Sequence, residues 1–227
     1  MKLVLVRHGQ SEWNQKNLFT GWTDVDLTEE GKEEARLAGQ RLKASGIEFD
    51  CAYMSVLKRA IKTCHIILDE MNQNWIPETK TWRLNERHYG ALQGLNKAET
   101  AEKYGADQVL LWRRSYDVMP PLLTTDKEDS PIHDRRYKRL QKETIPMGET
   151  LETTLQRVIP FWQDSIAPHM LAGDTVLVVA HGNSLRSLVK HIEEMTSEEI
   201  LKFELPTGQP LVYEMDKELQ VTNKYFL

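Results

Sequence analysis

The sequence contains little cysteine and no long apolar run. Its two cysteines, Cys51 and Cys64, form neither a CxxC pair nor a Cys/His spacing typical of a zinc site, so we expect buried, reduced thiols. The apolar run at residues 3–6 is far too short for a signal peptide, and no later stretch approaches the roughly 20 residues of a membrane span. We therefore expect a cytoplasmic protein without a membrane partner.

Net positive charge and linker sequence are also missing. The formal net charge of the 227-residue chain is −5, which argues against a general attraction to nucleic acid or to anionic membranes. Any anionic ligand must therefore be bound by local charge. No Gly/Ser-rich or Pro-rich stretch divides the chain, so we expect one domain, residues 1–227, built around one core.

The apolar pattern predicts strands that alternate with helices. Strongly apolar runs at residues 3–6 and 175–180 are typical of strands covered on both faces, and residues 49–54 are interpreted as a further short strand. Helical spacing follows these runs, at residues 28–46, 55–71 and 185–192. Ser55 is interpreted as the N-cap of the second of these helices. The alternation predicts an α/β fold with a largely parallel central sheet, flanked by helices on both faces in three layers.

The remaining segments are less regular. Residues 96–114 carry two short helical patterns, and residues 117–147 are polar, interrupted by proline and without a clear period. Helical spacing returns at residues 151–170, where Pro160 predicts a kink and Pro168 the end of the helix. The tail is expected to form a pair of edge strands, at residues 210–215 and 221–226.

Two distant segments of the chain repeat one pattern. His8 and His181 each follow an apolar strand, and each is followed by glycine, a polar residue and serine. Ligands of open α/β sheets bind beyond the carboxyl ends of the strands, so both imidazoles should enter one crevice if the two strands are neighbours. Gly9 and Gly182 would then let backbone N–H groups approach an anion closely.

Arginines accompany these histidines. Arg7 precedes His8, and Arg59 lies on the helix after the second strand. Guanidinium groups form bidentate hydrogen bonds to phosphate, and an imidazole nitrogen is a competent nucleophile toward phosphorus. The second histidine, if protonated, would stabilise charge on the transferring group. Each residue alone is more often structural, but two His-Gly-x-Ser copies after buried strands are hard to explain by packing.

The segment at residues 84–94 mixes acidic, basic and aromatic residues with glycine, which suits a site loop better than a core. Glu86 is the plausible proton shuttle, because phosphoryl transfer to or from an alcohol must move the hydroxyl proton. Two alternatives remain at this point. Glu86 could simply pair with Arg87 on the surface, and a dibasic pair such as Arg113 and Arg114 is usually solvated.

Five segments resemble one known family. They are RHGQSEWN at residues 7–14, FTGWTDVDL at 19–27, SVLKRAIKT at 55–63, NERHYGALQGLNKAET at 85–100 and AHGNSLR at 180–186. RHG alone resembles the histidine phosphatase superfamily in general. The ERHYGALQGLNK loop and the insertion after it are similar to the cofactor-dependent phosphoglycerate mutases in particular, and the match extends over nearly the whole chain.

This resemblance implies a role for each matching residue. His8 would be phosphorylated, Glu86 would be the general acid and base, and His181 would stabilise the transferring group together with Arg7 and Arg59. The implied substrate-binding residues are Ser11, Asn14, Thr20, Gly21, Arg87, His88, Tyr89, Lys97, Arg113, Arg114, Gly182 and Asn183.

The resemblance also implies ligands and assembly. The substrates would be 3-phosphoglycerate and 2-phosphoglycerate, 2,3-bisphosphoglycerate would be the primer, and no metal would be needed. Minor bisphosphoglycerate phosphatase and synthase activities would accompany the mutase. An insertion at about residues 95–147 would help to cover the site, and the protein would be a homodimer or homotetramer that binds no nucleic acid.

Two departures and two alternatives accompany this interpretation. Gln10 stands where many members carry Glu, and the chain ends at Leu227, where many relatives continue into a tail; we therefore expect more hydrolysis of 2,3-bisphosphoglycerate than in long-tailed relatives. One alternative is a phosphomonoesterase on the same scaffold. The other is a catalytically silent binding protein, which would be expected to have lost His8, Glu86 or His181.

Overall fold

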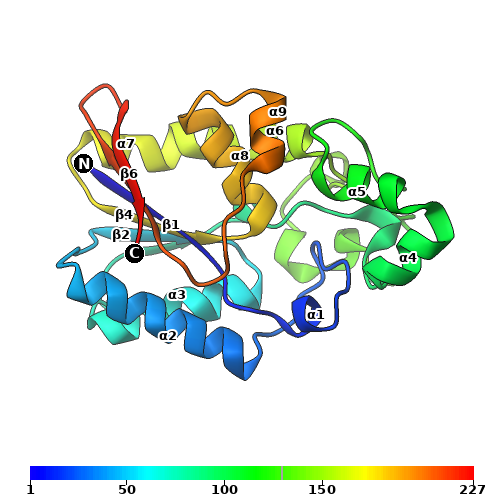
Figure 1. Cartoon of the computed structure of the whole chain (residues 1–227), viewed down its shortest axis with the longest axis horizontal. Helices are drawn as coiled ribbons and strands as arrows, with labels where there is room; N and C mark the ends of the chain where they lie inside the picture. The colour runs from blue at the N-terminus through cyan, green and yellow to red at the C-terminus, as the bar shows by residue number, and fades with distance from the viewer. Residues whose placement is uncertain (129) are drawn as a thin grey trace.

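A computed structural model describes residues 1–128 and 130–227. In this part of the chain a six-stranded mixed sheet lies between two layers of helices (Figure 1). The strands are β1 (Lys2–Arg7), β2 (Cys51–Met54), β3 (Glu78–Lys80), β4 (Val176–Ala180), β5 (Leu211–Met215) and β6 (Val221–Phe226), in the order β3-β2-β4-β1-β5-β6. The first four of that order pair in parallel, and β5 and β6 are antiparallel. The predicted α/β fold with a largely parallel sheet is confirmed.

Helices cover both faces of the sheet, which confirms the three layers. One face carries α2 (Glu29–Ala44) and α3 (Lys58–Met71), and the other carries α6 (Leu151–Phe161), α7 (Ala167–Leu171) and α8 (Gly182–Ile192) (Figure 1). The short α1 (Glu12–Gln15), with α4 (Lys97–Tyr104) and α5 (Ala106–Arg114), lies beyond the carboxyl ends of the parallel strands. The last helix is α9 (Ser197–Lys202).

The two central strands are buried on both faces. Leu3 and Leu5 of β1 pack in the cluster that includes Leu185 of α8, whereas Val4 and Val6 pack in the cluster of α2 and α3. This alternation follows from the two-residue period of a strand. Burial of each such side chain is worth about 1.5–3 kcal/mol, so β1 is fixed firmly between the two helical layers.

Pairing of β1 with β4 brings the two repeated segments together. Arg7 lies opposite Ala180 in the parallel register, and the backbone N–H of His8 donates to the carbonyl of Ala180 at 3.0 Å. The strands that precede His8 and His181 are therefore neighbours, as the shared-crevice interpretation required.

Two expectations about helix boundaries are wrong. Ser55 is no N-cap, because α3 begins at Lys58 after Leu57, which makes no side-chain cap. The helical spacing expected at residues 151–170 is confirmed, and a π-helical turn, Trp162–Ile166, directly follows the segment that contains Pro160, where a kink was expected. Proline removes one backbone donor and crowds the preceding turn, which favours such a local rearrangement. Pro168 lies in the first turn of α7 and does not end it.

The irregular segments match their predictions. Residues 96–114 form α4 and α5, and the described residues of 117–147 form only 3₁₀ turns, at Pro131–His133, Arg135–Tyr137 and Lys142–Thr144. Three elements, β3, α1 and α9, were not predicted. Cys51 and Cys64 are buried and free, as expected. Among the residues that the structure describes, no helix is long and apolar enough to cross a membrane.

Candidate active site

The carboxyl ends of the four parallel strands supply the polar residues of one site. His8 follows β1, His181 follows β4 and Ser55 follows β2. Glu86 comes after β3, beyond a 3₁₀ turn at Trp82–Leu84. Because parallel strands end at the same edge of the sheet, these four side chains lie close together at that edge although they are distant in the sequence.

A cavity of about 270 Å³ opens at this edge. Most of the predicted site residues line it: Arg7, His8, Asn14, Thr20, Gly21, Arg59, Glu86, Tyr89, Lys97, Arg113, Arg114, Gly182 and Asn183. Five further residues of the lining were missed: Leu18, Arg186, Glu204, Leu205 and Pro206.

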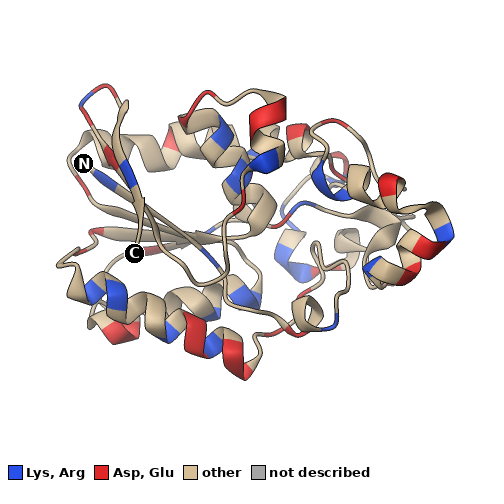
Figure 2. Cartoon of the chain, in the orientation of Figure 1, with Lys and Arg blue, Asp and Glu red and all other residues tan. Residues whose placement is uncertain are grey.

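The cavity is strongly cationic although the chain is acidic overall. Six Lys or Arg side chains line it, against two carboxylates, Glu86 and Glu204. Elsewhere acidic and basic residues alternate, as along the outer helix α2 (Figure 2). Such a concentration of one charge draws anions into the site in spite of the net charge.

The hydrogen bond and burial of His8 fix the state of its ring. Its Nδ1 lies 2.7 Å from the carbonyl oxygen of Gly9. A carbonyl only accepts hydrogen bonds, so Nδ1 carries the proton and Nε2 keeps a free lone pair. Burial, with the charges of Arg59 and Arg7, holds the pKa of His8 well below its ordinary value. The imidazole is therefore neutral at pH 7.

His181 lies against His8, with ring centroids 4.9 Å apart, but it does not itself line the cavity. Its Nε2 is 2.7 Å from the hydroxyl of Ser55. Burial and the nearby charge of Arg59 keep the pKa of His181 well below its ordinary value. The expectation of a protonated His181 is therefore wrong. When Ser55 donates to Nε2, the neutral ring presents Nδ1–H as a hydrogen-bond donor.

Several buried polar atoms indicate an anionic ligand. Within residues 1–128 and 130–227, no hydrogen-bond partner reaches Arg7 Nε, Arg59 Nε, Arg186 Nε, Thr20 Oγ1 or His181 Nδ1. A buried donor left without an acceptor costs about 1–3 kcal/mol. Phosphoryl and carboxylate oxygens would supply the missing acceptors, so these residues fit a phosphorylated ligand.

Arg59 is fixed before any ligand binds. Its two terminal nitrogens each donate at 2.8 Å, to the carbonyls of Thr23 and Gly21, and burial lowers its pKa to about 10. Arg186 is held in the same manner, by the carbonyl of Ile200 and the amide oxygen of Asn183, and burial lowers its pKa to about 10. Both guanidinium groups remain charged at pH 7.

The carboxylate of Glu86 accepts two backbone hydrogen bonds, from the N–H of Arg87 at 2.8 Å and that of Asn183 at 3.1 Å. The second donor is in the first turn of α8, where a negative charge is favoured. The guanidinium of Arg87 donates instead to the carbonyls of Trp112 and Arg113. The alternative of a surface ion pair between Glu86 and Arg87 is therefore wrong.

Some predicted substrate ligands lie outside the lining. Arg87 and His88 are fully buried, and the Nδ1 of His88 accepts from the N–H of Gly90 at 2.9 Å. Ser11 donates to the side-chain oxygen of Asn14 at 2.9 Å and caps α1. The structure does not bring these three side chains to the surface of the cavity.

Gly9 serves packing and not the approach of an anion. Its N–H donates to the hydroxyl of Thr63 at 3.1 Å, and a Cβ atom there would lie 2.0 Å from the carbonyl oxygen of Gly31. Gly182 differs, because it lines the cavity and an added Cβ would meet its nearest neighbours at ordinary distance.

Arg114 is not solvated freely, because its guanidinium forms an ion pair with Glu204. Lys97 and Arg113 line the same part of the site, and burial followed by the charge of Arg113 lowers the pKa of Lys97, while Tyr89 opposes this shift. No group of three or more His, Cys, Asp or Glu that could hold a metal occurs in the described part of the chain.

The chain matches known proteins over its whole length. The model of the histidine phosphatase superfamily (branch 1) matches residues 3–128 and 121–226. Proteins named 2,3-bisphosphoglycerate-dependent phosphoglycerate mutase from Haemophilus ducreyi and Neisseria meningitidis are 62% and 61% identical, over 100% of both chains. One from Lactiplantibacillus plantarum is 62% identical over 98% of this chain and 97% of its own.

Solved structures show the same fold. Bacillus stearothermophilus YhfR has a TM-score of 0.70 at 25% identity, covering 95% of this chain and 91% of its own. A mycobacterial glucosyl-3-phosphoglycerate phosphatase has a TM-score of 0.74 at 19% identity, covering 99% and 96%. The chain therefore belongs to the histidine phosphatase superfamily and, within it, to the family of the 2,3-bisphosphoglycerate-dependent phosphoglycerate mutases.

Replacement of Ser55 tests the arrangement around His181. Ser55→Ala removes the group that fixes the ring, so Nδ1–H would be present in only part of the molecules, and we expect turnover to fall about tenfold, less than the hundredfold or more that complete loss of one donor costs. Nitrogen NMR of the labelled imidazole should show a mixture of tautomers in place of one. Ser130→Ala, at another buried serine, is the control. Unchanged turnover and an unchanged tautomer in Ser55→Ala would contradict this role.

Acid should destabilise the protein through His8 and His181. Their folded pKa values are lowered, so the unfolded chain binds more protons once the pH falls through about 6.5, and stability decreases there. We expect the free energy of unfolding to decrease between pH 7.5 and 5.5, and to decrease more than in a variant that lacks the two imidazoles. Urea unfolding measures it. An equal drop in the His8→Asn/His181→Asn variant would refute the assignment.

Proposed function

We propose that the protein interconverts 3-phosphoglycerate and 2-phosphoglycerate, the mutase step of glycolysis and gluconeogenesis, through phosphorylated His8 and a 2,3-bisphosphoglycerate intermediate. One observation carries the proposal: a neutral, buried imidazole with a free Nε2 lies beside Arg7 and Arg59, and the buried Nε of each arginine has no acceptor. A phosphoryl group would complete their hydrogen bonds and meet the nucleophile at the same place.

Each group would have one task in the transfer. Bound 2,3-bisphosphoglycerate would supply the priming phosphoryl group. Nε2 of His8 forms the bond to phosphorus while the bond from phosphorus to the substrate oxygen breaks, and Glu86 gives that oxygen its proton. In the reverse direction Glu86 takes the hydroxyl proton as the bond between phosphorus and nitrogen breaks. His181, Arg7 and Arg59 stabilise the charge on the remaining oxygens.

The cavity favours a mutase over the phosphomonoesterase alternative, because its lining is basic beyond Arg7 and Arg59. Lys97, Arg113, Arg114 and Arg186 line it, which suits a ligand with a carboxylate and a second phosphate. Asn14, Thr20, Gly21, Tyr89, Gly182 and Asn183 would complete the contacts. We also propose that Ser11, Arg87 and His88 act through these neighbours, and that the insertion at residues 95–147 covers the bound ligand and excludes water from phosphorylated His8.

The direct test measures 2-phosphoglycerate formation from 3-phosphoglycerate with and without 2,3-bisphosphoglycerate. We expect turnover that depends on the primer, and one phosphoryl group on His8 by mass spectrometry. His8→Ala should abolish mutase and phosphatase activity, and Glu86→Gln should lower kcat about a hundredfold with little change in KM. Primed protein that hydrolyses phosphate esters but forms no 2-phosphoglycerate would overturn the proposal in favour of the phosphomonoesterase.

By the same family relationship we propose a cytoplasmic homodimer or homotetramer, since closed symmetric assemblies are the common state of such enzymes. Light scattering across a range of protein concentrations should give a mass of two or four chains. A constant monomer mass would rule out the assembly without affecting the proposed chemistry.

A further inference from the structure

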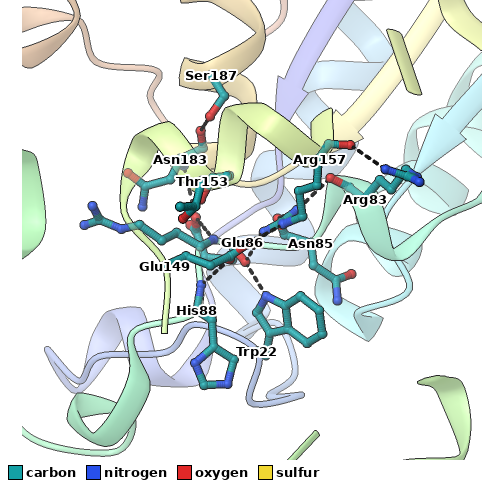
Figure 3. A network of polar contacts seen from close by, with 12 residues as sticks. Trp22, Arg83, Asn85, Glu86, His88, Glu149, Thr153, Arg157, Asn183 and Ser187 are labelled. Carbon is teal, nitrogen blue, oxygen red and sulfur yellow. Dashed lines mark hydrogen bonds and ion pairs between the residues drawn. The ribbon is translucent and has the colours of Figure 1, made fainter. Parts of the chain in front are cut away.

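Arg157 forms a buried hub next to the site without reaching the cavity (Figure 3). It lies on α6, on the face that packs into the core. Its Nε donates to Glu149 at 2.6 Å, one terminal nitrogen donates to the carbonyls of Arg83 and Asn85 at 2.6 and 3.0 Å, and the other donates to the carbonyl of Glu86 and to Glu149, both at 2.9 Å. All five N–H donors of the guanidinium are therefore used.

Glu149 extends this hub to the other side of the loop. Besides binding Arg157, its carboxylate accepts from the backbone N–H of His88 at 2.8 Å, and its own N–H donates to the carbonyl of His88 at 2.8 Å. The side chains of Glu149 and Arg157 are only 4% and 7% exposed. The pair therefore holds the backbone both before and after Glu86.

Glu86 is the residue on which these contacts converge. Its carbonyl oxygen accepts from Arg157 and also from the indole N–H of Trp22 at 2.6 Å (Figure 3). Its carboxylate accepts from the backbone N–H groups of Arg87 and Asn183. A proton donor must lie within hydrogen-bond reach of the reacting oxygen, and a displacement of about 1 Å can cost a hundredfold in rate.

We propose that Arg157 and Glu149 are positioning residues for the proton transfer by Glu86. This inference deepens the proposed function, on which it rests. A buried ion pair contributes little net stability compared with apolar residues of similar volume, so stability alone gives weak reason for one here. Only a fork with five donors can bind three carbonyls and a carboxylate together, and neither lysine nor an apolar side chain reproduces it.

The substitution Arg157→Lys isolates geometry from charge. Lysine keeps the positive charge near His181 but offers three donors in place of five. We expect kcat of the mutase to fall at least about tenfold with KM changed less than about threefold. Arg36→Lys, at an ion-paired arginine on the outer helix α2, is the matched control and should behave as the parent protein.

The double variant Arg157→Lys/Glu86→Gln shows whether Arg157 acts through Glu86 or supports the structure of the whole site. If Arg157 acts through Glu86, Arg157→Lys should cost less than about twofold when it is added to the Glu86→Gln variant. Phosphorylation of His8 by p-nitrophenyl phosphate gives a second comparison, because the stable p-nitrophenolate leaves without a proton. Its rate should change less than about threefold in Arg157→Lys.

Three results would overturn the proposal: an unchanged kcat in Arg157→Lys, an equal loss when Arg157→Lys is made in the parent protein and in the Glu86→Gln variant, or an equal loss with p-nitrophenyl phosphate. If Arg157→Lys fails to fold, the same three measurements are made on Glu149→Gln, which preserves the shape of the side chain. Should the parent protein form no 2-phosphoglycerate, the proposed function fails separately. The dependence on Glu86 would then be measured on hydrolysis of 3-phosphoglycerate.

Discussion

The parallel pairing of β1 with β4 is the constraint on which the site depends. Its register sets Arg7 opposite Ala180, so the residues that follow, His8 and His181, leave the sheet side by side. Both strands are buried on both faces, and a slip by one residue would turn every side chain to the opposite layer. The separation of the two imidazoles is therefore maintained by the apolar core, and the polar groups of the site need not hold it.

Burial gives the site its chemical character. It keeps His8 and His181 neutral, and so one ring can act as a nucleophile and the other as a neutral donor. The same burial leaves guanidinium nitrogens of Arg7, Arg59 and Arg186 without acceptors. Buried donors without acceptors lower the stability of the protein, and the oxygens of a phosphorylated ligand would supply the missing acceptors on binding. The same guanidinium nitrogens therefore lower the stability of the protein and raise its affinity for a phosphorylated ligand.

The sequence allowed the parallel sheet, the histidine pair and most of the cavity lining to be predicted, because these features depend on local pattern or on matching segments. It did not reveal Ser55 as the partner of His181, since a serine before a helix is ordinarily a cap. Arg186 and Arg157 were also missed. Each is a charged residue on the buried side of an amphipathic helix, which is a signal, but their partners lie on segments that only tertiary structure brings near.

The ion pair between Arg114 and Glu204 joins α5 to the segment that follows α9 at the rim of the cavity. An anion that binds Arg114 must compete with this carboxylate, which belongs to the protein itself. Binding at this point therefore exchanges the carboxylate of Glu204 for the anionic group of the ligand, and the free energy of the first ion pair is subtracted from that of the second. When the anion replaces Glu204, the ion pair no longer joins α5 to the segment that follows α9. The mobility of these two segments therefore rises as the anion occupies Arg114.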